Sequence, residues 1–247
     1  MRDDLLEAQA AIDWPVAQLP AFAKRFEVWL DANIQIEIEN VPPPATHNPI
    51  VAIEKDPLPF AFNVEMGAYV NTIRSSLDIL ATALAHRYGI PRPDEAYFPV
   101  ARSEADFKSG NYKGNEFVKG LPDTPRSFME ALKPYHGGNK TLWFLHQLDI
   151  MRKHRRLIVA EVSSLRLTIH GREPPPWDFT PLTTGWIRVN EKTVLGLIRK
   201  GAPDYDIKFI PHIAINEPGL ITHRPVISTL HHLAHFTELV ISVFDNP

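Results

Sequence analysis

Apolar and polar positions repeat with two different periods along this chain. Between residues 60 and 160 the apolar side chains recur at steps of three and four, which is the spacing of one helix face. The stretch NIQIEIEN instead alternates strictly, with Ile34, Ile36 and Ile38 on one side, as in a half-buried strand. The chain therefore carries helices and strands in separate blocks.

The helical period, together with capping residues and prolines, predicts five helices at residues 3–32, 62–88, 124–132, 141–162 and 225–244. Pro15 and Pro20 are expected to break or kink the first of them. Alternation predicts strands at residues 34–39, 50–56, 165–170, 186–190, 193–200 and 206–215. A hairpin turn is expected at residues 190–192, where the letters are NEK.

Strands and helices do not alternate along the chain, so a doubly wound parallel sheet is not expected. The order predicts an α+β fold, in which a bundle of three to four long helices packs on a mostly antiparallel sheet. The bundle comes from residues 60–162 and 225–244, the sheet from residues 33–56 and 165–215, and both belong to one domain, 1–247. The strand at 34–39 is expected to pair with a strand of 165–215, because an isolated hairpin is marginal in water.

Composition narrows the function classes. The 247 residues are 44% hydrophobic and 22% charged, with a net charge of −3, so no field of the whole chain attracts nucleic acid. There is no cysteine, which excludes disulfides, thiolate zinc sites and a cysteine nucleophile, and which fits a cytoplasmic location. The first residues do not have the pattern of a signal peptide, and no apolar run approaches a membrane span. We expect a soluble cytoplasmic protein.

A polar stripe interrupts the predicted helix 62–88. Asn71, Arg74 and Asp78 stand at i, i+3 and i+7, so helical geometry places them on one face. One interpretation is an exposed Arg74–Asp78 ion pair. The other is a buried polar cluster that includes His154 and Arg155 of the helix 141–162, because His154 is predicted to face the apolar side and to need a partner.

The segments NTIRSSLDILATAL, YFPV, LKPY and LWFLHQLDIMRKHRRL resemble a family of uncharacterised bacterial proteins with N-L-R-S-A-L-D-H-L and D-K-H-R helices. The resemblance covers about residues 60–160 and implies no activity. Arg152 stands where that family has an aspartate, so an acid–base pair beside His154 is not implied. The R-S-x-L-D helix is also similar to the HEPN superfamily of nucleotide- and RNA-associated helical domains. The positions that match the uncharacterised bacterial family are Asn71, Arg74, Asp78, Phe98, Pro99, Pro134, Tyr135, Lys153, His154 and Arg155.

Two further patterns carry candidate catalytic chemistry. Arg224 and His231 have the spacing of a HEPN ribonuclease pair on one helix face, although Pro225 occupies a position where that family has a polar residue. His231, His235 and Glu238 stand at i, i+4 and i+7, where one helix could present metal ligands, and His146 and Asp149 are a similar pair. HHLAH lacks the glutamate of H-E-x-x-H, so we expect no metal, and a solvated face explains the trio.

The sequence HGGNKT offers a candidate anion site. Gly137, Gly138 and Lys140 precede a predicted helix, where backbone N–H groups and an ammonium could hold an anion. Ordinary helix capping explains the same letters, with Gly137 as a C-cap and Asn139 as an N-cap.

These patterns favour a binding or regulatory protein with a buried Asn/Arg/Asp/His cluster and no cofactor. Its partner is an unknown small ligand or a protein, with RNA and a second copy of the chain also considered, and no membrane is involved. The alternatives are a HEPN-like metal-independent ribonuclease or nucleotide-binding domain, and a histidine-ligated metal-dependent hydrolase. Whether the protein is an enzyme stays open in the sequence.

Overall fold

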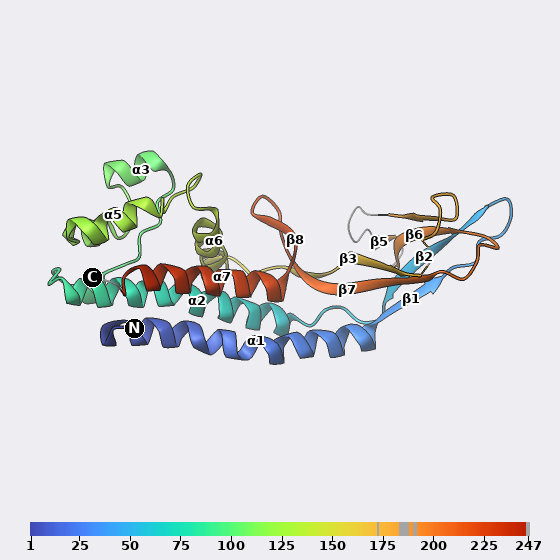
Figure 1. Cartoon of the computed structure of the whole chain (residues 1–247), viewed down its shortest axis with the longest axis horizontal. Helices are drawn as coiled ribbons and strands as arrows, with labels where there is room; N and C mark the ends of the chain where they lie inside the picture. The colour runs from blue at the N-terminus through green and yellow to red at the C-terminus, as the bar shows by residue number, and fades with distance from the viewer. Residues whose placement is uncertain (172, 183–187, 190–191, 246–247) are drawn as a thin grey trace. The chain divides into compact units, whose positions relative to one another are not determined.

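The computed structural model describes residues 1–171, 173–182, 188–189 and 192–245 (Figure 1). It confirms an α+β fold of long helices and antiparallel sheets. None of the described helices combines the length and the apolar character needed to cross a lipid bilayer. The elements in chain order are η1 Asp3–Leu5, α1 Leu6–Asn33, β1 Ile34–Ile38, β2 His47–Glu54, α2 Phe60–Arg87, η2 Pro93–Glu95, α3 Glu104–Ser109, α4 Asn115–Gly120, α5 Asp123–Ala131, α6 Lys140–His154, β3 Ala160–His170, β4 Phe179–Pro181, β5 Arg188–Val189, β6 Lys192–Arg199, β7 Asp206–Glu217, β8 Ile221–Pro225 and α7 Val226–Val243.

The chain divides into two compact units. The helical unit consists of Met1–Pro20, Asn63–Ile158 and Ile227–Pro247, and the sheet unit consists of Ala21–Phe62 and Val159–Val226. The assignment of the whole chain to a single domain stays a prediction.

The core of the helical unit is built around α2. Its apolar stripe, including Ile73 and Leu77, is fully buried. Asn63 of α2 donates to the Ile158 carbonyl at 2.8 Å, and a side chain at Gly67 would meet Arg152 of α6 at 2.9 Å. The expectation that α2 and α6 pack against each other is therefore confirmed. In the same unit α2 and α7 run side by side (Figure 1).

Two helix predictions need correction. Pro15 and Pro20 do not break the first helix, because both lie inside α1, which continues to Asn33; the alternative, a kink, stays a prediction. Pro15 is buried, so its ring contributes packing that offsets the missing backbone hydrogen bond. The helix predicted to reach residue 162 ends at His154, because residues from Ala160 onward pair with β7 as β3. A short apolar run such as the one after His154 is compatible with both a helix and a strand. Pairing with β7 selects the strand.

The sheet unit contains two antiparallel sheets. One has five strands in the order β1-β2-β6-β4, with β5 also paired to β6, and the other has the order β3-β7-β8. Between them lies a small core of Ile50, Ala52, Phe179 and Leu195, against which Ile207 and Phe209 of β7 pack. Both sheets thus bury one face in the same unit.

In the part of the chain that the structure describes, the strand at 34–39 pairs with no strand of 165–215, contrary to expectation. Among the described residues β1 pairs with β2, and β2 pairs with β6. The segments 33–56 and 165–215 therefore share one sheet, but they meet through β2 rather than through β1. Local hairpin closure costs less chain entropy than the long-range pairing, which explains the order. Part of the expected turn at 190–192, residues 190–191, lies outside the described residues.

Candidate functional site

The polar stripe of α2 fixes the loop that follows η2. Arg74 is fully buried, and its guanidinium donates to the Asp78 carboxylate at 2.9 Å and to the Phe98 carbonyl at 3.1 Å. The Phe98 amide in turn donates to the same Asp78 oxygen at 3.0 Å. The Tyr97 ring covers the guanidinium at 4.8 Å. Arg74 and Asp78 therefore hold both backbone polar groups of Phe98, and with them the loop around it.

A second set of polar contacts joins α2 to α6. Asp149 is 2% exposed and accepts a hydrogen bond from Asn71 at 3.0 Å. Lys153, one turn later on α6, forms an ion pair with Asp149 at 2.7 Å. Asn71 thus contacts a buried polar group, as in the interpretation of the stripe as a buried cluster. Its partner on α6 is Asp149 and not the expected His154.

His154 and Arg155 do not join this cluster. His154 is exposed as the last residue of α6, and no described hydrogen bond connects it to Asn71, Arg74 or Asp78. The prediction that it faces the apolar side was wrong because α6 ends there, so the helical period no longer applies to the apolar residues after it. Arg155 is exposed and lines a cleft.

His146, rather than His154, is the histidine that lies near this cluster. It lies one turn before Asp149 on α6, close enough to the cluster to be affected by the charges of Arg74 and Lys153. Burial, followed by the Arg74 charge, lowers the pKa of His146 to about 4, although Asp149 opposes this shift. Its Nδ1 atom is buried and has no hydrogen-bond partner among the described residues. At neutral pH the cluster therefore contains a neutral imidazole with one unused nitrogen.

A cleft of about 830 Å³ opens beside this cluster. Its walls come from the loop at 97–102, from α3, from the loop at 111–113 and from one face of α6. It includes three rings, three basic side chains, one acid and several neutral groups. The lining residues are Tyr97, Val100, Arg102, Asp106, Asn111, Tyr112, Lys113, Trp143, His146, Gln147, Ile150 and Arg155.

Two loops of the cleft are held by close backbone contacts. Gly114 has φ +94°, and a Cβ there would lie 2.3 Å from the Tyr97 carbonyl oxygen, so only glycine permits this approach. Ala101 forms a parallel bridge with Tyr135, and its amide donates to the Pro134 carbonyl at 2.8 Å. The segments YFPV and LKPY, far apart in the sequence, are thereby brought together beside the polar stripe.

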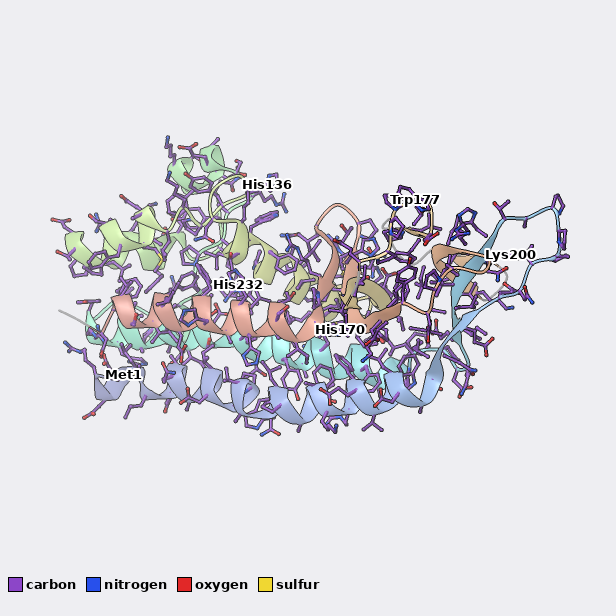
Figure 2. All side chains as sticks on the ribbon, turned by 45° about the vertical axis from the view of Figure 1, so that its right-hand side comes forward. Met1, His136, His170, Trp177, Lys200 and His232 are labelled. Carbon is purple, nitrogen blue, oxygen red and sulfur yellow. The ribbon has the colours of Figure 1, made fainter. Side chains whose placement is uncertain are left out.

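The aromatic wall continues onto the N-terminal end of α6. Trp143 contacts the ring of His136, labelled in Figure 2, with centroids 4.9 Å apart. Thr141 lies 3.3 Å from the imidazole of His232 of α7, also labelled in Figure 2. These contacts position the first turn of α6, and with it Trp143.

The predicted ribonuclease pair does not share a helix face. Arg224 is in β8 and His231 is in α7, because Pro225 ends the strand and the helix begins at Val226. Both side chains are exposed.

The metal trio of α7 and the anion candidate also lie outside the cleft, whereas His146 of the second metal pair lines it. His231 and His235 are exposed on α7, and Glu238 lies 3.4 Å from His235. Within the described ranges no group of three or more histidine and acidic side chains is arranged to hold a metal ion. At the third candidate, Gly137 lies in a loop rather than at the end of α5, which ends at Ala131, and Gly138 packs on the Lys133 carbonyl. Lys140 is the exposed first residue of α6, and Asn139 caps that helix as expected, accepting from the Leu142 amide at 3.0 Å.

The sequence missed Tyr97, Lys113 and Trp143 as cleft residues, and it named His146 and Asp149 only as a metal pair. One signal was present for Asp149. It stands four residues before Lys153 and three after His146, the same helical spacing that revealed the stripe on α2. No local pattern marks the loop residues, because only the fold brings them to α6.

The chain matches no protein-family model, no curated protein and no solved structure. The resemblances to an uncharacterised bacterial family and to HEPN domains therefore stay predictions.

The Arg74–Asp78 pair predicts a large effect of Asp78→Ala. The substitution leaves a fully buried guanidinium with one acceptor fewer and frees the Phe98 amide, so it should lower the free energy of unfolding by roughly 3 to 5 kcal/mol. Urea unfolding at pH 7 measures this. Glu104→Ala is the control, since Glu104 and Lys108 form an exposed pair with the same spacing. Equal unfolding curves for the two variants would contradict the interpretation.

His146 predicts a pH-dependent stability. Its folded pKa of about 4 lies below the ordinary value of 6.5, so only the unfolded chain takes up the proton between these values. Stability from this group is complete above pH 6.5 and falls as the pH drops toward 4, by up to about 3 kcal/mol in total. His146→Gln should remove this part of the decline, measured by urea unfolding from pH 7 to 4. The exposed His231→Gln should retain it, and a decline in His146→Gln as steep as in wild type would refute the assignment.

Gly114 predicts a difference between two glycine substitutions. Gly114→Ala adds a clash with the Tyr97 carbonyl to an unfavourable φ and should cost more than about 2 kcal/mol. Gly137→Ala has a similar φ of +86° but nothing within 4 Å, and should cost about 1 kcal/mol. Thermal unfolding of both variants gives the comparison. A Gly114→Ala protein as stable as Gly137→Ala would show that the two loops are not in contact.

Proposed function

We propose that this protein binds a small anionic molecule with a planar ring in the cleft of the helical unit. The observation that carries the proposal is the composition of the cleft wall, where basic side chains alternate with aromatic rings around a neutral histidine. A volume of about 830 Å³ lies in the usual range for small-molecule sites. The sequence favours a binding or regulatory protein, and this proposal assigns the binding to one cleft.

The charge of the cleft favours an anion. Arg102, Lys113 and Arg155 line it, and in the part of the chain that the structure describes none of the three forms a salt bridge. The single acid, Asp106, already accepts a hydrogen bond from the Ser103 hydroxyl at 2.9 Å. The cleft thus has an excess of positive charge in a chain whose net charge is −3. A local excess of this kind concentrates anions near the wall.

The rings favour a flat group on the ligand. Tyr97 is held by the Arg74 guanidinium at 4.8 Å and the Lys113 ammonium at 3.8 Å, and Tyr112 stacks on Phe107 at 4.9 Å. Trp143 is half-buried on the opposite element, α6. Aromatic side chains fixed in this way offer a planar ligand a large contact area at a small cost in conformational entropy.

Two neutral polar groups add specificity. The Nδ1 atom of His146 has no partner among the described residues, and Gln147 lies next to it on the cleft wall. A neutral imidazole donates from one nitrogen and accepts at the other, and an amide does both. Both side chains line the cleft, so they can select a ligand by its hydrogen-bonding groups as well as by its charge.

Three probes separate the contributions of charge and ring. Adenosine monophosphate has both, inorganic phosphate has only the charge, and adenosine has only the ring. We expect isothermal titration calorimetry to show tighter binding of the monophosphate than of either part, and weaker binding at high salt. Lys113→Ala and Arg102→Ala should each weaken monophosphate binding about tenfold, through the loss of one charged contact.

Lys140→Ala is the matched control, because Lys140 is a lysine of the helical unit outside the cleft and belongs to the other anion candidate. It should bind the monophosphate as wild type does. Loss of binding in Lys140→Ala with retention in Lys113→Ala would move the site to the N-terminus of α6. Failure of wild type to bind any of the three probes would count against the proposal.

A further inference from the structure

The strand β1 lies at an edge of the five-stranded sheet. Among the described residues it pairs with β2 alone. Its sequence, IQIEI, contains no proline and no lysine, the residues that most often protect such an edge. By contrast, β4 at the far end of the same sheet is three residues long and ends in Pro181. Nothing in its own sequence therefore prevents β1 from accepting another strand.

The register with β2 shows which backbone groups face outward. The Lys55 amide donates to the Asn33 carbonyl and the Glu39 amide to the Pro49 carbonyl, both at 2.9 Å. In an antiparallel pair the bonded positions alternate, so Gln35 and Glu37 also direct their backbone groups toward β2. The N–H and C=O groups of Ile36 and Ile38 consequently point to the open edge.

The side chains of β1 divide between two faces. Ile34, Ile36 and Ile38 share one face, and Ile34 packs against the core of the sheet unit. Ile36 and Ile38 continue this apolar face but are 38% and 57% exposed. Gln35 and Glu37 share the other face, where the Gln35 amide donates to the Glu37 carboxylate at 2.5 Å.

These facts make β1 complementary to itself. When two antiparallel copies are centred on Ile36, each Ile36 faces the other Ile36, and Ile34 faces Ile38. Gln35 then faces Glu37 in a non-hydrogen-bonded pair, where side chains approach most closely, so an amide donor meets a carboxylate and no like charges meet. The outward backbone groups of Ile36 and Ile38 are those that this register would bond.

We propose that β1 pairs with β1 of a second copy of this chain, which joins two five-stranded sheets into one across a twofold axis at Ile36. We assign a second copy to this edge because one twofold axis at Ile36 satisfies three conditions. Isoleucines face isoleucines, Gln35 faces Glu37, and the outward backbone groups of the two strands face each other. A closed twofold contact uses the edge of each copy and so stops at a dimer.

Sedimentation velocity tests the proposal on the whole chain. Wild type should sediment with twice the mass of the 28.0 kDa chain. Ile36→Lys and Ile36→Glu should each sediment as monomers, because like charges then face each other at the axis. An equimolar mixture of the two variants should restore the dimer, since a lysine of one copy then faces a glutamate of the other.

Val243→Lys is the matched control, because Val243 of α7 is 37% exposed, close to the exposed fraction of Ile36. It should remain dimeric. Hydrogen exchange gives a second readout that also reports folding. The amides of Ile36 and Ile38 should be protected in wild type and exchange rapidly in Ile36→Lys, whereas those of Gln35 and Glu37 should stay protected in both.

Three results would overturn the proposal. They are a wild type that is monomeric at every concentration, a dimer that persists in both charged variants, and a mixture of these variants that stays monomeric.

Discussion

The burial of one guanidinium constrains the loop that lies against α2 in the helical unit. Arg74 is fully buried in α2, so its charge requires partners that water cannot supply. Asp78 provides one, and the Phe98 carbonyl provides another across a gap of 24 residues in sequence. Because Asp78 also binds the Phe98 amide, the loop has little freedom at that point. A buried charge of this kind is weak evidence for stability, but it specifies which loop lies against the helix.

The cleft is a consequence of that constraint. The loop fixed at Phe98 carries Tyr97 and Arg102 to the wall, and the close contact at Gly114 adds Lys113. From the other side, α6 supplies Trp143 and His146. Burial is the main cause of the low pKa of His146, and the charge of Arg74 lowers that pKa further. The guanidinium that positions the loop therefore also contributes to keeping this imidazole neutral.

The two proposed sites use different physics. The cleft of the helical unit depends on rings and on cations that form no salt bridge with any described residue, and their positions come from several distant segments. The proposed contact at the edge of β1 depends on five consecutive residues. It also depends on the antiparallel register with β2, which decides which backbone groups point outward. Charge in the cleft makes binding there sensitive to salt, whereas the β1 edge offers mainly backbone hydrogen bonds and isoleucine contacts, which salt weakens little.

The sequence by itself determined the α+β class, the long helix α2, the strand β1 and the stripe of Asn71, Arg74 and Asp78. These follow from periods of 3.6 and 2, which are local properties of the chain. It could not determine that α6 ends at His154, because the competing strand β3 is stabilised by β7, some 45 residues away in sequence. Nor could it replace His154 by Asp149 as the partner of Asn71. Only the tertiary structure decided which polar side chains meet, because burial and pairing depend on contacts between segments that no local period relates.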